Sequence, residues 1–377
     1  MHGMLRALGL AVVVATVFVA RAQAPVTLKE AYRDAFAVGA AINAAQFTEQ
    51  DARGAALVRA QFNSITPENA LKWENIHPRL DTYEFDLADK YVAFGEQNHM
   101  LIVGHCLVWH NQIPGEVFRD NRGNLVSRKV LLKRMHDHIR MVVSRYKGRI
   151  NSWDVVNEAL NEDGSLRPTL WLKIIGEDYI AKAFQYAHEA DPRAELTYND
   201  YSLENEPKRN GALALIKNLK AQGVPITSVG LQGHDNLTWP SVAQQDATIS
   251  AFGKLGVHVI ISELDVDVLP TPPMEQGTAD VSARVEADPS LNPYTSGLPE
   301  GVQQALAKRY AELFGSFLRH RDVVQRVTLW GVSDADSWRN NWPVRGRTNY
   351  PLLFDRNGQA KLAWTAVIQA ATAKPAN

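Results

Sequence analysis

The chain has 377 residues, of which 45% are hydrophobic and 21% are charged, as in an ordinary globular protein with a large core. Its 40 lysines and arginines nearly balance its 41 aspartates and glutamates, so the formal net charge is −1. A near-neutral chain has no electrostatic bias towards nucleic acids or anionic membranes, and we expect neither as a partner.

The first 24 residues have the pattern of a cleavable signal peptide. Arg6 precedes an apolar run from Ala7 to Ala20, which is shorter than the roughly 20 residues that a membrane-spanning helix needs. A retained membrane anchor is therefore the less favoured alternative. Small residues after the run predict cleavage after Ala22 or Ala24. The mature protein, residues 25–377, should then be exported, either into a periplasm or out of the cell.

Short apolar or β-branched runs follow, and helix-like segments separate them. The runs are 36–43, 62–69, 101–109, 150–158, 195–200, 228–234, 257–265 and 326–334. Segments such as 131–146 and 299–318 repeat apolar residues at steps of three and four, which is the helical period. Eight alternating units predict parallel strands in a single (β/α)8 TIM barrel of the α/β class. The alternative, an open doubly wound sheet, usually has a Gly-rich turn after its first strand, which this sequence lacks.

Cys106 is the only cysteine, so no intramolecular disulfide can form. It lies within a predicted strand, and we expect a buried, unreactive thiol, because the adjacent His105 points to the opposite face of the sheet. His136 and His138 are two positions apart on a predicted helix and point in different directions. We interpret them as solvated side chains rather than metal ligands, and we expect no metal or cofactor.

Polar and aromatic residues gather where the predicted strands end. They are Glu68 and Asn69, the stretch from His105 to Trp109, Asn157 and Glu158, Asn199 and Asp200, Gln232 to His234, Glu263 to Asp265, and Trp330 onward. The C-terminal strand ends of a TIM barrel surround its active site. One charged strand end could be an isolated ion pair, but so many on one rim predict a functional cleft.

Glu158 and Glu263 end the fourth and seventh predicted strands, and we interpret them as a catalytic pair. Two carboxylates across a cleft carry out glycoside hydrolysis, in which one protonates the leaving oxygen while the other attacks the anomeric carbon or activates a water. Asn157 could hold a sugar hydroxyl beside Glu158. His234 and Asp265 could keep Glu263 ionised and oriented.

Tryptophans also lie at the predicted rim. Trp109, Trp330 and Trp338 lie at or just beyond strand ends, where a flat ring can stack on the apolar face of a sugar. Packing in the core is the usual fate of a tryptophan, and we expect it for Trp153 and Trp364.

Seven motifs in order resemble the endo-β-1,4-xylanases of glycoside hydrolase family 10. They are FNSITPENALKWENIHP, GHCLVWHNQIP, WDVVNEAL, TYNDYSLE, GLQGH, ISELDVDV and LWGVSDADSWR. The resemblance covers the chain from about Ala35 to Ala371. It implies an enzyme that hydrolyses internal bonds of xylan, with xylan and xylo-oligosaccharides as its partners, and that retains anomeric configuration through a covalent glycosyl-enzyme.

The resemblance also implies roles for single residues, with Glu158 as general acid/base and Glu263 as nucleophile. The implied sugar-binding residues are Glu68, Asn69 and Lys72 on the non-reducing side, His105, Trp109 and Gln112 around the sugar next to the cleaved bond, Asn157 at its 2-hydroxyl, Gln232, His234 and Asp265 around the nucleophile, Trp330 and Trp338 near the cleavage site, and Tyr201 on the leaving-group side. A retaining mechanism predicts carboxyl groups about 5–5.5 Å apart. It also predicts that the charge of Glu263 raises the pKa of Glu158.

A long segment rich in Pro, Gly and Asp, residues 269–301, follows the seventh predicted strand. Loops of this length are uncommon unless they are functional or flexible. We expect either that it shapes one end of the cleft or that it is a surface loop without sugar contacts.

Two other functions remain open. The first is a glycosidase that acts on glucan, mannan or a small aryl glycoside. The second is a barrel that only binds sugar or protein, although such barrels typically lose one of the two carboxylates. No linker or second module follows the predicted barrel, so residues 25–377 should form one catalytic domain, which we expect to be a monomer.

Overall fold

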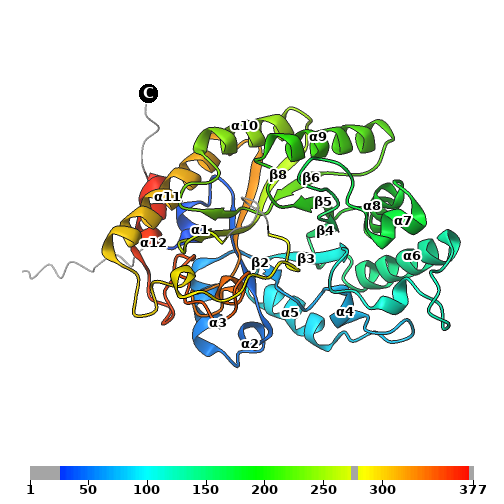
Figure 1. Ribbon diagram of the computed structural model, residues 1–377, viewed down its shortest axis with the longest axis horizontal. Helices are drawn as coiled ribbons and strands as arrows, with labels where there is room; N and C mark the ends of the chain where they lie inside the picture. The colour runs from blue at the N-terminus through cyan, green and yellow to red at the C-terminus, as the bar shows by residue number, and fades with distance from the viewer. Residues whose placement is uncertain (1–25, 273–278, 373–377) are drawn as a thin grey trace, which may run out of the picture.

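The computed structural model describes residues 26–272 and 279–372, so the predicted signal peptide lies outside the described residues. Parallel strands form a closed barrel with helices around it (Figure 1). The barrel strands are β1 (Ala37–Ile42), β2 (Ser64–Pro67), β3 (Leu101–Val108), β4 (Ser152–Asn157), β5 (Glu195–Asp200), β6 (Ser228–Leu231), β8 (His258–Asp267) and β9 (Val324–Leu329). β9 pairs with β1 and closes the ring, which confirms the predicted TIM barrel.

Helices surround the barrel on its outside (Figure 1). They are α1 (Leu28–Ala31), α2 (Ala44–Phe47), α3 (Ala52–Gln61), α4 (Trp73–Ile76), α5 (Asp86–Gln97), α6 (Arg128–Arg145), α7 (Leu170–Ile175), α8 (Tyr179–Ala190), α9 (Glu206–Ala221), α10 (Val242–Gly253), α11 (Glu300–Arg319) and α12 (Leu362–Thr372). Short 3₁₀ turns lie at η1 (Gly115–Val117), η2 (Pro289–Leu291) and η3 (Trp338–Asn340). Within the described residues, none of these helices combines the length and apolar character needed to cross a bilayer.

Each of the eight predicted runs overlaps one barrel strand, although β8 continues past its run to Asp267 and β9 begins before its run at Val324. Two runs differ from the structure in an informative way. The run 228–234 is split into β6 and the short β7 (His234–Asn236). Gly233 lies between them with φ at 76°, a left-handed conformation that interrupts a strand. The run 326–334 is too long at its end, because β9 stops at Leu329 and the chain then turns into the loop of the catalytic rim.

The hydrophobic core joins buried apolar residues of the strands to those of the surrounding helices. The strands also bury polar side chains, among them Asp154, Thr197 and Thr328. Trp153 is buried as expected, and Trp364 is partly buried against the core. Cys106 is buried, which confirms that part of the expectation, and burial raises the pKa of its thiol well above the usual value.

The expectation of a solvated His138 is wrong. His138 is completely buried, its Nδ1 lies 3.0 Å from Nδ1 of His77, and its ring stacks on Trp73 with centroids 3.5 Å apart. The reason is helical geometry, since position 138 falls on the same face of α6 as Met135 and Ile139, which point to the core. Only His136 lies near the surface, with 36% of its side chain exposed.

Candidate active site

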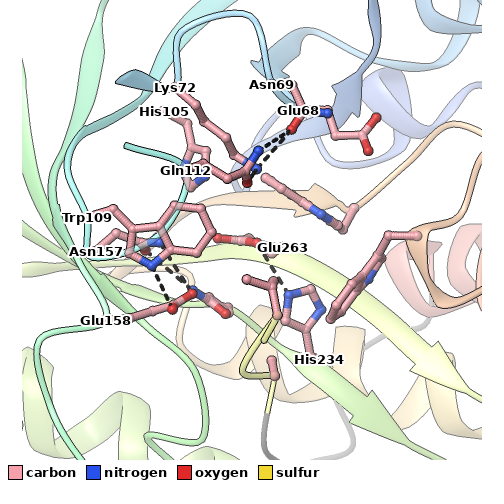
Figure 2. Close-up of a pocket in the computed structure, with 15 residues that line it drawn as sticks. Glu68, Asn69, Lys72, His105, Trp109, Gln112, Asn157, Glu158, His234 and Glu263 are labelled. Atoms are coloured by element: carbon pink, nitrogen blue, oxygen red, sulfur yellow. Dashed lines mark hydrogen bonds and ion pairs between the residues drawn. The ribbon is translucent and has the colours of Figure 1, made fainter. Parts of the chain in front are cut away.

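A cavity of about 180 Å³ lies at the C-terminal ends of the barrel strands. All of the predicted site residues line it except Tyr201 and Asp265, and Ala279 and Val281 line it in addition. Figure 2 shows Glu158 and Glu263 inside this cavity, with Lys72, Asn69 and Gln112 along one side of it. The barrel therefore brings together residues that are far apart in the sequence, from Glu68 to Trp338.

Glu158 follows the last residue of β4 and is only 3% exposed. Its φ of 57° is unusual for a residue with a side chain, and such strain is commonly stored at functional sites. Trp109 donates a hydrogen bond of 2.8 Å to Glu158 Oε2. Gln232 donates one of 3.1 Å to Oε1. Asn157 also donates to Oε1 over 3.3 Å, so donors at three strand ends fix the carboxyl group.

Burial raises the pKa of Glu158 to about 7, and the negative charge of Asp200 contributes further. Glu263 also raises this pKa, but by less, while the hydrogen bonds from Gln232 and Trp109 oppose the shift. The direction agrees with the sequence-based prediction. The main cause differs, because burial and Asp200 outweigh the charge of Glu263.

Glu263 lies within β8 and is 5% exposed. Burial alone would raise its pKa, but the imidazoles of His234 and His105 and the amide of Asn199 outweigh burial and lower it. His234 Nε2 lies 3.3 Å from Glu263 Oε2. The two glutamates therefore share one cavity while their surroundings shift their pKa values in opposite directions.

Asp265 lies behind His234 rather than on the cavity wall, with its Oδ2 3.2 Å from His234 Nδ1. Trp338 and Arg339 donate hydrogen bonds of 2.6 and 3.0 Å to the same carboxylate. Burial lowers the pKa of His234, but Asp265 and Glu263 outweigh it and bring the value to about 9. His234 is therefore a cation at neutral pH, held between two carboxylates.

The side of the cavity that carries Lys72, Asn69 and Gln112 is a preformed polar wall. Lys72 Nζ donates hydrogen bonds to Asn69 Oδ1 over 3.0 Å and to Gln112 Oε1 over 2.8 Å. Gln112 in turn donates a bond of 3.0 Å to Glu74. Glu68 continues this wall, and burial raises the pKa of its carboxyl group. Donors and acceptors held in this way suit the hydroxyl groups of a sugar.

His105 and Trp330 close the floor of the cavity. His105 Nδ1 lies 2.9 Å from Asp154 Oδ2, so its other ring nitrogen is left for the cavity. The rings of His105 and Trp330 meet edge to face, with centroids 5.4 Å apart. Trp338 stacks on Trp342 with centroids 4.5 Å apart, which fixes the orientation of its indole.

The structure does not place Tyr201 on the cavity wall. Tyr201 is 2% exposed, and its hydroxyl accepts a hydrogen bond of 2.6 Å from Arg167. The Nζ of Lys208 lies 3.5 Å from the centre of its ring. A face that is covered by a lysine cannot stack on a sugar, so the expected stacking role does not fit this geometry.

Three residues in or next to the cavity, Asn199, Ala279 and Val281, were not assigned a role from the sequence. Asn199 donates hydrogen bonds of 2.8 Å to Asn157 Oδ1 and 2.7 Å to Glu263 Oε1. Its place at a polar strand end was the available signal. Ala279 and Val281 carry no such signal, because small apolar residues in a long loop do not reveal which way they face.

Comparisons with known proteins agree with this geometry. The sequence matches Glycosyl hydrolase family 10 over residues 27–370. It is 45% identical over 340 residues to Endo-1,4-beta-xylanase A of Xylanibacter ruminicola, covering 90% of this chain and 92% of that protein. It is 40% identical over 345 residues to Beta-1,4-xylanase of Dictyoglomus thermophilum, covering 91% of this chain and 90% of that protein.

Solved structures agree as well. A GH10 endoxylanase retrieved from a sugarcane soil metagenome is 48% identical with a TM-score of 0.88, over 91% of this chain and 99% of that one. Xylanase XynB from Paenibacillus barcinonensis, complexed with a conduramine derivative, is 37% identical with a TM-score of 0.82, over 91% of this chain and 98% of that one.

Proposed function

The chain belongs to glycosyl hydrolase family 10, and we propose that Glu158 and Glu263 carry out its hydrolysis of internal β-1,4-xylosidic bonds in xylan, with retention of configuration. The enzyme class, an endo-1,4-β-xylanase, follows from the family and from the xylanases it resembles along nearly their whole length. The assignment of each glutamate to a step follows from the chemistry of the cavity.

One observation carries this assignment: two buried carboxyl groups in one cavity have pKa values that are shifted apart. At neutral pH Glu263, with its lowered pKa, is a carboxylate and can act as the nucleophile. Glu158, with a pKa of about 7, is substantially protonated and can act as the acid. Opposite shifts of this kind distinguish acid from nucleophile in glycosidases.

In the first step, a carboxylate oxygen of Glu263 forms a bond to the anomeric carbon of the sugar. The glycosidic bond breaks at the same time, and the proton of Glu158 passes to the leaving oxygen. Glu263 is now an ester and has lost its charge, which removes one of the interactions that raise the pKa of Glu158. In the second step, Glu158 accepts a proton from water as the water attacks the anomeric carbon and releases Glu263.

The polar wall of Glu68, Asn69 and Lys72 holds the sugars on the non-reducing side. Lys72 is 7% exposed and fixed by Asn69 and Gln112, so this wall cannot retreat to admit a larger sugar. A xylose ring lacks the hydroxymethyl group of a hexose. The fixed wall therefore favours xylan over glucan or mannan.

We also propose that residues 1–24 are removed during export and that the mature enzyme works as a monomer in the periplasm or outside the cell. The N-terminal sequence of the exported protein would locate the cleavage site at Ala22 or Ala24. Sedimentation of the mature protein would give its oligomeric state.

The decisive experiment incubates the purified mature protein with β-1,4-xylan, cellulose and mannan in parallel and resolves the products by chain length. We expect a spread of short xylo-oligosaccharides from xylan alone, and none from the Glu263→Ala variant. Products from cellulose or mannan instead would redirect the substrate assignment. A wild-type protein that released nothing from any polymer would overturn the proposal.

A further inference from the structure

A short loop segment, residues 279–281, forms part of the cavity wall. Ala279 and Val281 both line the cavity, and Ala279 is only 2% exposed. The segment belongs to the long connection from β8 to α11. In Figure 2 its yellow ribbon lies across the cavity from Lys72 and Asn69. The wall is therefore apolar on this side and polar on the other.

Asp280 anchors this segment through both its side chain and its backbone. Its Oδ2 lies 3.2 Å from Arg167 Nη1, and its carbonyl oxygen accepts a hydrogen bond of 3.0 Å from Trp342. Its Oδ1 accepts bonds of 2.9 and 2.6 Å from the backbone and hydroxyl of Ser282. Contacts through both the side chain and the backbone of Asp280 fix the path of its two apolar neighbours.

Arg167 connects this anchor to the catalytic acid. Its Nε donates a hydrogen bond of 3.1 Å to the backbone carbonyl of Glu158, and its Nη2 donates bonds to Leu160 O and Tyr201 Oη over 3.3 and 2.6 Å. The side chain is 15% exposed. A guanidinium group presents several donors in one rigid plane, so one side chain can hold two chain segments at a fixed spacing.

We propose that Arg167 is a positioning residue that couples the 279–281 wall to the backbone of Glu158, and that this wall supports the sugar on the leaving-group side of the cleaved bond. The inference rests on the proposed function. The non-reducing side is assigned to the polar wall at Lys72, so the opposite wall faces the leaving group. Glu158 delivers its proton to that leaving oxygen, and a linked wall and acid keep the oxygen within reach of the proton.

The test compares two substrates that differ in the leaving group, namely xylohexaose, whose leaving group is a xylose chain, and an aryl β-xylobioside. The Asp280→Asn variant removes the ion pair and keeps the shape of the side chain. We expect it to lower kcat/KM on xylohexaose about tenfold, through a raised KM. On the aryl substrate, kcat/KM should stay within about twofold of the wild-type value. An aryl group makes few of the contacts that a xylose chain makes.

Arg167→Met should add a loss of kcat on both substrates, because it also releases the carbonyl of Glu158. If the pair acts as a unit, the double variant should be no worse than Arg167→Met alone. The control is Asp178→Asn, which removes a similar arginine partner on an exposed face, at Arg128, away from the cavity wall. The control variant should keep the wild-type kcat and KM on both substrates.

If Asp280→Asn lowered kcat/KM equally on both substrates, or on neither, the inference would be overturned while the enzyme remained a xylanase. A wild-type protein that is inactive on both substrates would overturn the proposed function itself. Thermal unfolding of each variant separates a loss of fold from a loss of positioning. Asp280→Asn is the milder change and keeps the test valid if Arg167→Met folds poorly.

Discussion

Asn199 donates a hydrogen bond of 2.7 Å from its side-chain amide to the carboxylate of Glu263. The same nitrogen donates to Asn157 Oδ1 over 2.8 Å, and the amide of Asn157 lies 3.3 Å from Glu158 Oε1. Two amides thus bridge the two carboxyl groups. Such a bridge fixes their relative positions and favours the ionised form of Glu263.

We expect the Asn199→Ala variant to lower kcat about 10- to 100-fold, because a hydrogen bond to a charged group contributes about 1.5–3 kcal/mol. Loss of this donor also raises the pKa of Glu263, so the acidic limb of the rate profile should move to higher pH. The measurement is kcat against pH on a xylo-oligosaccharide. Asn218→Ala, on an exposed part of α9, is the control. An unchanged acidic limb in Asn199→Ala would refute the bridging role.

The pH dependence of the wild-type enzyme should be bell-shaped. Activity requires Glu263 without its proton and Glu158 with its proton, so kcat/KM should fall below the lowered pKa of Glu263 and above about 7. Trp109→Phe removes a bond that lowers the pKa of Glu158, and the alkaline limb should therefore move to higher pH. If the alkaline limb did not move in Trp109→Phe, a group other than Glu158 would have to cause the loss of activity at high pH.

Chemical rescue should distinguish the two glutamates. Glu158→Ala should lose about 10²–10⁴-fold on xylan, the usual range for a general acid, but less on an aryl xyloside whose leaving group needs no proton. Added azide should restore turnover and give a β-glycosyl azide, because the ester at Glu263 still forms. Glu263→Ala with azide should give the α-product. The same anomer from both variants would contradict the assigned roles.

The ion pair behind the nucleophile should also control its charge. Asp265→Asn removes the carboxylate that contributes most to the raised pKa of His234, so that pKa should fall from about 9. A less charged His234 stabilises the ionised Glu263 less, and we expect kcat to fall about 10- to 100-fold with an upward shift of the acidic limb. Glu195→Gln is the matched control, because it removes a similar histidine partner at the exposed His258. Equal effects of the two variants would rule out a specific role for Asp265.

The fold was predictable because eight short runs of apolar or β-branched residues alternate with segments of helical periodicity. Most of the runs end in polar residues. The same polar ends predicted most of the cavity, since a closed barrel brings all C-terminal strand ends to one rim. Glu158 and Glu263 are an example, because Glu158 directly follows β4 and Glu263 lies in the C-terminal half of β8.

What the sequence did not reveal depends on the orientation of side chains beyond the strands. Tyr201 directly follows β5, but Lys208 lies over its ring and the residue is not part of the cavity wall. Ala279 lines the cavity beside Asp280, which contacts the distant residues Arg167 and Trp342. Contacts between distant loops of this kind leave no periodic pattern in the sequence.

The buried pair of His77 and His138 predicts a loss of stability in acid. Burial lowers the pKa of both rings, most strongly that of His138. Below the ordinary histidine pKa of about 6.5, the unfolded chain therefore binds protons that the folded chain does not, and the free energy of unfolding falls as pH falls. His138→Phe keeps an aromatic ring against Trp73 and removes one titrating group.

We expect the free energy of unfolding of His138→Phe, measured by denaturant at neutral and mildly acidic pH, to fall less between the two conditions than that of the wild type. His136→Phe, at the more exposed histidine of the same helix, should keep the wild-type pH dependence. Losing the contact to His77 changes the free energy of unfolding by the same amount at both pH values. This change cancels when the difference between the two pH values is compared across variants. A wild-type pH dependence in His138→Phe would show that this pair does not limit the stability of the enzyme in acid.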